Sequence, residues 1–403
     1  MMHARYITSL VFGLMMVQFT TAQNIDSNKV HVKKNWYETF SIRGYAQVRY
    51  NGLFQTNPDL KNEQGDRSWG GNNGFFIRRL RLVFSGQLKK HVSFYIQPDF
   101  ASSASSTSLH FGQIRDAYFD IGIDAKNEFR FRVGQSKVPY GFENMQSSQN
   151  RLPLDRNDAL NSAVANERDL GVFFYWASAE KRKLFQSLVN DGLKGSGDYG
   201  IIGIGAYNGQ TANKPELNNQ QHIVARVCYP FQLKSQIVEF GLQAYTGNVV
   251  IASDQISVGT KINANKSYLD QRVAASFIIY PKPFGLQAEY NIGKGPEFNI
   301  KTDSIELRKL YGGYVMASYK ANFANQVFIP FTRLHTYNGG KKHELDARSY
   351  VVNELEVGVE WQANKNFELV AMYTVSKRRF EDFKNQANLQ SGSLLRLQAQ
   401  VNF

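Results

Sequence analysis

The chain ends on Leu395-Arg396-Leu397-Gln398-Ala399-Gln400-Val401-Asn402-Phe403, a segment in which apolar and polar residues alternate strictly. A period of two places the apolar side chains on one face of a β-strand and the polar side chains on the other. A soluble sandwich strand alternates in the same way, but it rarely sets so many polar groups opposite a face that ends in a terminal aromatic residue. We therefore expect the last strand of a barrel that crosses the outer membrane, with its apolar face in lipid.

The same alternation recurs along the chain, for example at 40–50, 354–361 and 367–376. Each segment has roughly nine to eleven residues, the length that a tilted strand needs to cross a bilayer. The connections between segments alternate in length. Short turns are expected at 86–91, 124–128, 281–283, 321–324 and 363–365, and long polar links at 51–74, 101–111, 137–169, 246–270, 294–308, 336–350 and 377–391.

Short periplasmic turns and long extracellular loops are typical of a bacterial transmembrane barrel. We expect an all-β fold, a transmembrane antiparallel β-barrel of about 16 strands, because an even number returns both termini to the periplasmic side. Fourteen and eighteen strands stay as alternatives, since the pattern is weakest from Gly171 to Tyr207. A turn is expected near 177–180 there, and the next strand could begin near Leu184 or near Tyr199. A barrel of this width leaves a water-filled lumen.

The composition agrees with this fold. Hydrophobic residues make up 42%, aromatic residues 13%, and the mean hydropathy is −0.40, which fits strands with one apolar and one wet face. The single cysteine, Cys228, excludes an internal disulfide. The formal net charge of +13 is spread over strands and loops. This distribution argues against nucleic acid and favours anionic solutes or the anionic outer lipid surface.

The N-terminus resembles a Sec signal peptide, with Arg5, an apolar run at 7–19 and a cleavage site after Ala22. A membrane anchor is the alternative, but the apolar run is too short to span a bilayer comfortably. We expect residues 1–22 to be the signal peptide, 23–39 a periplasmic N-terminal extension, and 40–403 the barrel. Whether the extension plugs the lumen is left open.

Arginines are expected on the faces that line the pore. Arginine keeps its charge in a pore, and its planar fork binds phosphate or carboxylate oxygens in pairs, so rings of arginine select anions. The alternative is a neutral wall, in which these arginines pair with the lumen acids Asp116, Asp120, Glu239 and Glu289. The pore-lining candidates for anion binding are Arg43, Arg49, Arg79, Arg81, Arg130, Arg132, Arg226, Arg272 and Arg396.

The longest well-bounded link, 137–169, is expected to fold inward as a constriction loop, because the third long loop does so in sixteen-strand porins. Its basic candidates are Lys137, Arg151, Arg156 and Arg168, which lie among Asp155, Asp158, Glu167 and Asp169 and could set a transverse field. A solvated surface loop is the alternative.

Several segments resemble one known family. Gly134-Gln135-Ser136-Lys137-Val138-Pro139-Tyr140-Gly141-Phe142-Glu143 is similar to the signature GQ-x-K-x-P-[FY]-G-x-E of the phosphate-selective porin O and P family. Further segments that resemble its landmarks are Phe76-Ile77-Arg78-Arg79-Leu80-Arg81-Leu82, Arg168-Asp169-Leu170-Gly171-Val172 and Tyr207-Asn208-Gly209. The resemblance covers nearly the whole mature chain and implies a trimeric, sixteen-strand, anion-selective pore. The loop is richer in arginine and acids than in the clustered lysines of strongly phosphate-selective members, a departure that favours general anion passage.

The predicted function is passive diffusion of small anionic solutes, with phosphate or pyrophosphate as candidates. The alternatives are a non-selective general diffusion porin and a surface receptor or adhesion barrel, for which Asn338–Lys342 could be a contact loop. Expected partners are outer-membrane lipid, lipopolysaccharide and two further copies of the chain. No catalytic residue, metal site or cofactor is predicted. The mature histidines fit no nucleophile-elbow or helical zinc pattern and are expected in loops or turns: His31, His91, His110, His222, His335 and His343.

Overall fold

A computed structural model describes residues 35–53, 73–100, 111–386 and 388–403. Within these residues, seventeen strands form one antiparallel sheet that closes into a barrel. The strands are β1 Ser41–Leu53, β2 Gly74–Lys89, β3 Val92–Asp99, β4 Gln113–Gly122, β5 Phe129–Lys137, β6 Arg168–Trp176, β7 Ile202–Tyr207, β8 His222–Leu233, β9 Gln236–Val250, β10 Ser267–Ile279, β11 Phe284–Asn299, β12 Ser304–Tyr319, β13 Ala321–Phe323, β14 Gln326–Gly340, β15 Ser349–Gln362, β16 Phe367–Glu381 and β17 Leu389–Asn402.

Strand pairing follows the order of the chain. Both β12 and β13 pair with β14, at different parts of its length, so together they occupy one position in the sheet. The barrel therefore has 16 strand positions. The predicted fold class and strand number are thus confirmed. Short helices lie in the connections of the described chain: η1 Trp36–Thr39, α1 Phe142–Met145, α2 Asp158–Asn161, η2 Ala165–Glu167, α3 Ala179–Asn190, η3 Ser253–Gln255 and η4 Leu345–Ala347. Among the described residues, no helix is long and apolar enough to cross a membrane.

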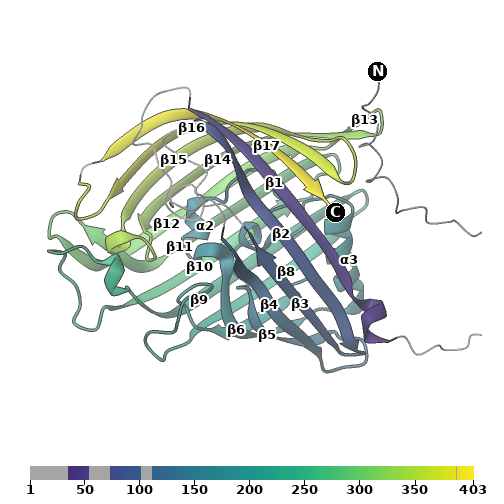
Figure 1. Cartoon of the computed structure of the whole chain (residues 1–403), viewed down its shortest axis with the longest axis horizontal. Coiled ribbons are helices and arrows are strands. Elements are labelled where there is room, and N and C mark those ends of the chain that lie inside the picture. The colour runs from purple at the N-terminus through teal and green to yellow at the C-terminus, as the bar shows by residue number, and fades with distance from the viewer. Residues whose placement is uncertain (1–34, 54–72, 101–110, 387) are drawn as a thin grey trace, which may run out of the picture. The chain divides into compact units, whose positions relative to one another are not determined.

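The barrel closes where the last strand meets the first. The pairing of β17 with β1 runs from Tyr45–Asn402 to Leu53–Leu394, and Figure 1 shows the yellow and purple strands side by side. At the end of this seam, the Gly44 N–H donates to the Phe403 carbonyl at 2.7 Å, and the Phe403 N–H donates to the Gly44 carbonyl at 3.0 Å. The terminal aromatic residue is therefore part of the closing sheet.

Several connections differ from the sequence prediction. The turn expected at 321–324 contains the short strand β13, and the long link expected at 377–391 is shortened because β16 ends at Glu381 and β17 begins at Leu389. The strand after β6 begins at Ile202, close to the Tyr199 alternative, and the Leu184 alternative is wrong. Leu184 belongs to α3, which buries Leu184, Phe185 and Leu188 and begins at Ser178, whose hydroxyl accepts a hydrogen bond from the Lys181 N–H. The apolar residues 184, 185 and 188 have a helical spacing, which the sequence prediction interprets as the start of a strand.

Another difference is the link expected at 294–308, which is short in the structure because β11 and β12 extend to Asn299 and Ser304. The side chain of Asn299 accepts a hydrogen bond from the Lys301 N–H at 3.1 Å, and Glu306 accepts hydrogen bonds from Thr302 and Ser304. This polar turn makes a tight hairpin out of a segment that has the composition of a loop.

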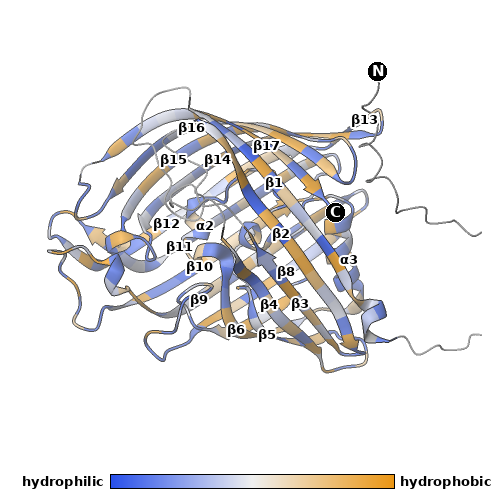
Figure 2. Cartoon of the chain, in the orientation of Figure 1, coloured by the Kyte–Doolittle hydropathy of each residue, from blue (hydrophilic) through white to orange (hydrophobic). Residues whose placement is uncertain are grey.

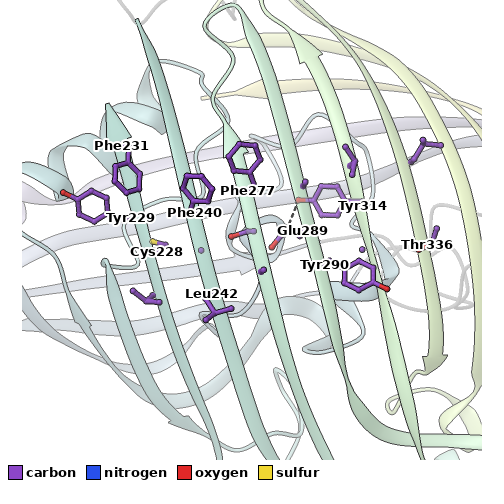
Figure 3. Close-up of a pocket in the computed structure, with 18 residues that line it drawn as sticks. Cys228, Tyr229, Phe231, Phe240, Leu242, Phe277, Glu289, Tyr290, Tyr314 and Thr336 are labelled. Carbon is purple, nitrogen blue, oxygen red and sulfur yellow. Dashed lines mark hydrogen bonds between the residues drawn. The ribbon is translucent and has the colours of Figure 1, made fainter. Parts of the chain in front are cut away.

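The outer face of the barrel is apolar, and Figure 2 shows hydrophobic and hydrophilic residues alternating along the strands. Near the short-turn end, rings from three neighbouring strands contact one another (Figure 3). The ring centroids of Phe231 and Phe240 are 6.1 Å apart, and those of Phe240 and Phe277 are 4.9 Å apart. These rings border a shallow outward-facing groove of about 850 Å³. They form an aromatic girdle of the kind that marks a membrane interface.

The seam at Gly44 generates the first prediction. A Cβ at Gly44 would lie 2.6 Å from the Arg81 carbonyl oxygen and 2.7 Å from the Phe403 ring, so Gly44→Ala should lower the free energy of unfolding by about 1–3 kcal/mol. Urea unfolding in lipid vesicles, followed by Trp fluorescence, measures the change. Gly74→Ala is the control, because a Cβ there meets no described atom within 4 Å. Equal stabilities of the two variants would show that the seam is not tightly packed.

Candidate functional site

The connection between β5 and β6, residues 138–167, lies inside the barrel and contacts strands on several sides of it. The Ser148 carbonyl accepts a hydrogen bond from Gln47 on β1 at 3.3 Å, and the Ser162 hydroxyl accepts one from Arg272 on β10 at 2.7 Å. Glu143 pairs with Arg333 on β14 at 2.5 Å. Because β1, β10 and β14 are far apart around the sheet, this segment crosses the lumen, and Figure 1 shows its helix α2 within the barrel.

One half of the lumen is filled by an apolar core. The loop contributes Tyr140 and Leu160, which pack against inward-facing residues between β6 and β16 such as Phe173 and Phe331. The rings of Tyr140 and Tyr245 meet edge to face at 4.9 Å. Close-packed side chains leave no route for ions. A solute path is therefore expected outside this core.

Buried ion pairs hold the loop against the wall. Asp155 pairs with Arg49 on β1 at 2.9 Å and also with Arg396 on β17. Asp158 pairs with Arg378 on β16 at 3.0 Å and with Lys341 at 2.5 Å. The structure thus places two of the predicted pore-lining arginines, Arg49 and Arg396, against a loop carboxylate.

Four further candidates bind groups of the protein itself. Arg272 pairs with Asp270 at 3.2 Å, Arg226 with Glu239 at 3.4 Å, and Arg130 with Asp198 at 2.7 Å. Arg132 donates two hydrogen bonds to Asp120, at 2.7 and 2.8 Å. The neutral-wall alternative therefore describes this part of the lumen.

A second network of charges joins β2, β3 and β4 to the end of the loop. Asp99 lies between Arg81 and Arg115, at 2.7 and 3.9 Å, and Glu167 lies between Arg115, Arg156 and Arg168, at 3.3, 2.8 and 2.6 Å. Asp116 also accepts hydrogen bonds from Arg168. In this network the four guanidinium groups of Arg81, Arg115, Arg156 and Arg168 share three carboxylates, so positive charge is left over.

Two buried arginines beside this network have no carboxylate partner in the described part of the chain. Arg79 donates to Gln47, and Gln47 in turn donates to Ser148 of the loop. Arg151 of the loop donates to the Leu154 carbonyl, and its Nε and one terminal nitrogen have no hydrogen-bond partner. The two guanidinium groups repel each other electrostatically. A buried, unpaired cation is costly, so this place favours an anion.

A bulge in β2 adds Arg78, which the sequence prediction missed. Gln47 is opposite Arg79, but Val48 is opposite Ile77, so Arg78 is the extra residue. The bulge lets Arg78 and Arg79 line the same lumen cavity. Without the bulge, strict alternation along β2 would place the Arg78 side chain on the lipid-facing side of the strand. Arg115, Arg333 and Arg378 were also missed, although their alternation in apolar strands was visible.

Two lumen cavities in the described chain are both lined by residues of β2 and β3. The loop-side cavity, of about 610 Å³, is lined by Arg78, Arg79, Arg81 and Arg115. The turn-side cavity, of about 680 Å³, is lined by Arg43, Tyr45, Tyr95 and Gln97 and by residues 147, 149 and 150 of the loop. The two walls meet where Arg81 donates to the Tyr45 hydroxyl at 2.8 Å. The candidate solute path thus runs along β1–β4.

The segment 134–143 shapes the loop. Lys137 donates to the carbonyls of Met145 and Gln146 at 2.7 and 2.6 Å. Gly134 has φ of 125°, and a Cβ there would lie 2.3 Å from the Ala117 carbonyl oxygen. Glu143 accepts from the Asn157 N–H at 2.8 Å. Lys137 therefore positions the loop backbone, and its ammonium group is used within the protein.

Neighbouring guanidinium groups lower the pKa of two loop carboxylates, Glu143 and Glu167. Burial tends to raise the pKa of Glu143, but the charges of Arg333 and Arg151 outweigh burial and lower it. Burial acts in the same direction on Glu167, whose pKa is lowered by Arg156 and Arg168. Because these pKa values lie below those of the unfolded chain, the stability from these carboxylates is present at neutral pH and is lost as the pH falls through the lowered values.

Asp158, His335 and Glu354 bring potential metal-ligand atoms within 4.8 Å of one another. His335 lies on β14, not in the loop or turn expected for it, at 3.1 Å from Glu354. Arg378 pairs with both carboxylates, and Lys341 pairs with Asp158. Side-chain cations already neutralise these acids, so the cluster is an ion-pair network that anchors the loop.

Comparison with known proteins identifies the family. The sequence profile of phosphate-selective porin O and P matches residues 48–403. The chain belongs to the phosphate-selective porin O and P family. It is an outer-membrane porin, a barrel for passive diffusion. No curated protein sequence matches the chain.

Solved structures share the porin fold. The outer membrane channel DcaP of Acinetobacter baumannii has a TM-score of 0.57 at 15% identity, and OmpF of Salmonella typhi in complex with daunomycin has 0.54 at 14%. OmpT of Vibrio cholerae, folded in vitro, has 0.52 at 8%. Each alignment covers 90% of this porin and 97% of the other chain. At these identities, the likeness establishes the fold alone.

The buried tethers generate the second prediction. Arg333→Met removes the partner of Glu143 and Glu356, so the porin should lose about 3–5 kcal/mol of stability, and the freed loop should make single-channel currents noisier. Urea unfolding and bilayer recording measure the two effects. Arg308→Met is the matched control, because Arg308 is 45% exposed and lies 3.8 Å from Glu297, so its loss should cost at most about 1 kcal/mol. If the Arg333→Met porin keeps its stability and its single-channel current noise is unchanged, Arg333 does not hold the loop in place.

Proposed function

We propose that this porin conducts small anions in preference to cations. The supporting observation is the charge imbalance between β2–β4 and the loop, where eight basic side chains gather around four carboxylates. The basic residues are Arg78, Arg79, Arg81, Arg115, Lys137, Arg151, Arg156 and Arg168, and the carboxylates are Asp99, Asp116, Glu143 and Glu167. An anion that passes along β1–β4 meets this excess, which lowers the barrier for negative solutes.

Within this proposal, the loop at 137–169 narrows the path, since it packs against the β6–β16 wall and faces β1–β4. Phosphate and pyrophosphate are candidate solutes, because guanidinium groups bind phosphate oxygens in pairs. A non-selective general diffusion porin is the competing function. A decrease of chloride current on addition of phosphate, at constant ionic strength, supports anion binding in the path. Additive currents without competition favour general diffusion.

The remaining expectations extend the proposal. Residues 1–22 act as a signal peptide and 23–39 as a periplasmic extension, while the chain assembles as a homotrimer in lipid and lipopolysaccharide without catalytic activity. A receptor with Asn338–Lys342 as its contact loop is disfavoured, because Lys341 and Lys342 are buried and bind Asp158 and Asp270. These lysines are used to hold the lumen loop and β10.

Charge removal in the path is the third prediction. Arg79→Gln and Arg151→Gln should each lower the chloride-to-potassium permeability ratio by about twofold. A charge about 8 Å from an ion changes its energy by roughly 0.5 kcal/mol at a water-like dielectric constant. Reversal potentials in asymmetric potassium chloride measure the ratio. Lys309→Gln removes the same charge from an exposed position on β12 and should leave the ratio unchanged. Cation preference in the unmodified porin would refute the proposed anion path.

A further inference from the structure

A stack of aromatic rings that anion conduction alone does not use ends at the turn-side cavity. Tyr95 on β3 lines the cavity, and its ring lies parallel to that of Tyr118 on β4, with centroids 5.2 Å apart and an angle of 12° between the planes. The guanidinium of Arg132 lies 4.0 Å from the centroid of the Tyr118 ring. Three strands thus contribute one layer each to a stack that ends at the cavity.

Contacts within the protein hold this stack in place. Asp120 holds Arg132 through two hydrogen bonds, and the same guanidinium also faces the rings of Tyr175 and Tyr199, at 5.4 Å from each centroid. Arg132 therefore contacts Asp120 and three tyrosine rings at once, and it packs against the face of Tyr118 that is opposite Tyr95. A preorganised ring loses little conformational entropy when it binds a ligand. The cavity therefore presents Tyr95 as a fixed aromatic surface.

Small residues leave space next to the other face of Tyr95. Its register partner on β2 is Ser85, and Val83, two residues earlier, is opposite Arg43 on β1. Arg43 is exposed, lines the same cavity and has no partner in the described part of the chain. Its charge acts on the Tyr95 side chain. An aromatic surface and an uncommitted guanidinium thus lie close together on one wall.

We propose that the turn-side cavity is a binding site for planar aromatic carboxylates, with the ring on Tyr95 and the carboxylate on Arg43. The inference rests on the anion preference proposed above and adds a substrate class to it. A guanidinium binds a carboxylate through two parallel hydrogen bonds, and offset rings attract each other beyond their buried area. The cavity of about 680 Å³ is large enough, since about 150 Å³ holds a benzene molecule.

Block of the chloride current by two carboxylates of equal charge and similar size tests the site. Benzoate has a planar aromatic ring, whereas cyclohexanecarboxylate has a puckered saturated ring. In the unmodified porin, the half-blocking concentration of benzoate should be about two- to tenfold lower. Tyr95→Leu should abolish the difference and Tyr95→Phe should keep it, because the ring is what matters. Arg43→Gln should weaken block by both carboxylates about equally.

The outcomes separate the two proposals. If chloride is not preferred over potassium, the anion path itself fails. If chloride is preferred but benzoate and cyclohexanecarboxylate block equally, the aromatic site is refuted and the anion path stands. A difference that survives Tyr95→Leu also refutes the site at Tyr95. Single-channel steps of normal size in each variant show that the barrel has folded.

Discussion

A sheet in hydrocarbon cannot keep a free edge, because unpaired backbone N–H and C=O groups find no water there. In this porin, the pairing of β1 with β17 removes that edge, and the hydrogen bonds between Gly44 and Phe403 complete the seam. Closure also determines which side of every strand faces inward, since alternate side chains point to opposite faces. The position of the charged groups in the lumen therefore depends on the same pairing that removes the free edge of the sheet.

The lumen loop lies across the barrel, and in the proposed function it narrows the solute path. Its apolar residues fill the half between β6 and β16, and its carboxylates each bind a wall cation, as Glu143 binds Arg333 and Asp155 binds Arg49. Buried ion pairs contribute little net stability but fix geometry, because breaking one leaves a buried charge alone. The wall arginines therefore divide into two groups. Those opposite the loop acids hold the loop, and those on β2–β4 outnumber their acids and face the solute.

The strands, their faces and the inward-folding loop were predictable, because period-two alternation and loop length are local properties of the sequence. The partner of each arginine was not, since it depends on contacts between distant residues: Arg49 meets Asp155 only after the loop has crossed the lumen. The bulge at Arg78 was hidden for a related reason, as one extra residue shifts the alternation without a marker in the sequence. Helix α3 was missed because its apolar residues at 184, 185 and 188 also fit a short strand.

The family signature at 134–143 encodes architecture more than selectivity. Lys137 is bound by backbone carbonyls, Glu143 by Arg333 and Asn157, and Tyr140 is buried in the apolar core. None of these side chains lines either of the two described lumen cavities. A chain that carries this signature therefore folds its loop in the same way, whichever solute it passes. In the proposed function, selectivity is therefore set by residues outside the signature, such as Arg79 and Arg43, which line the two lumen cavities.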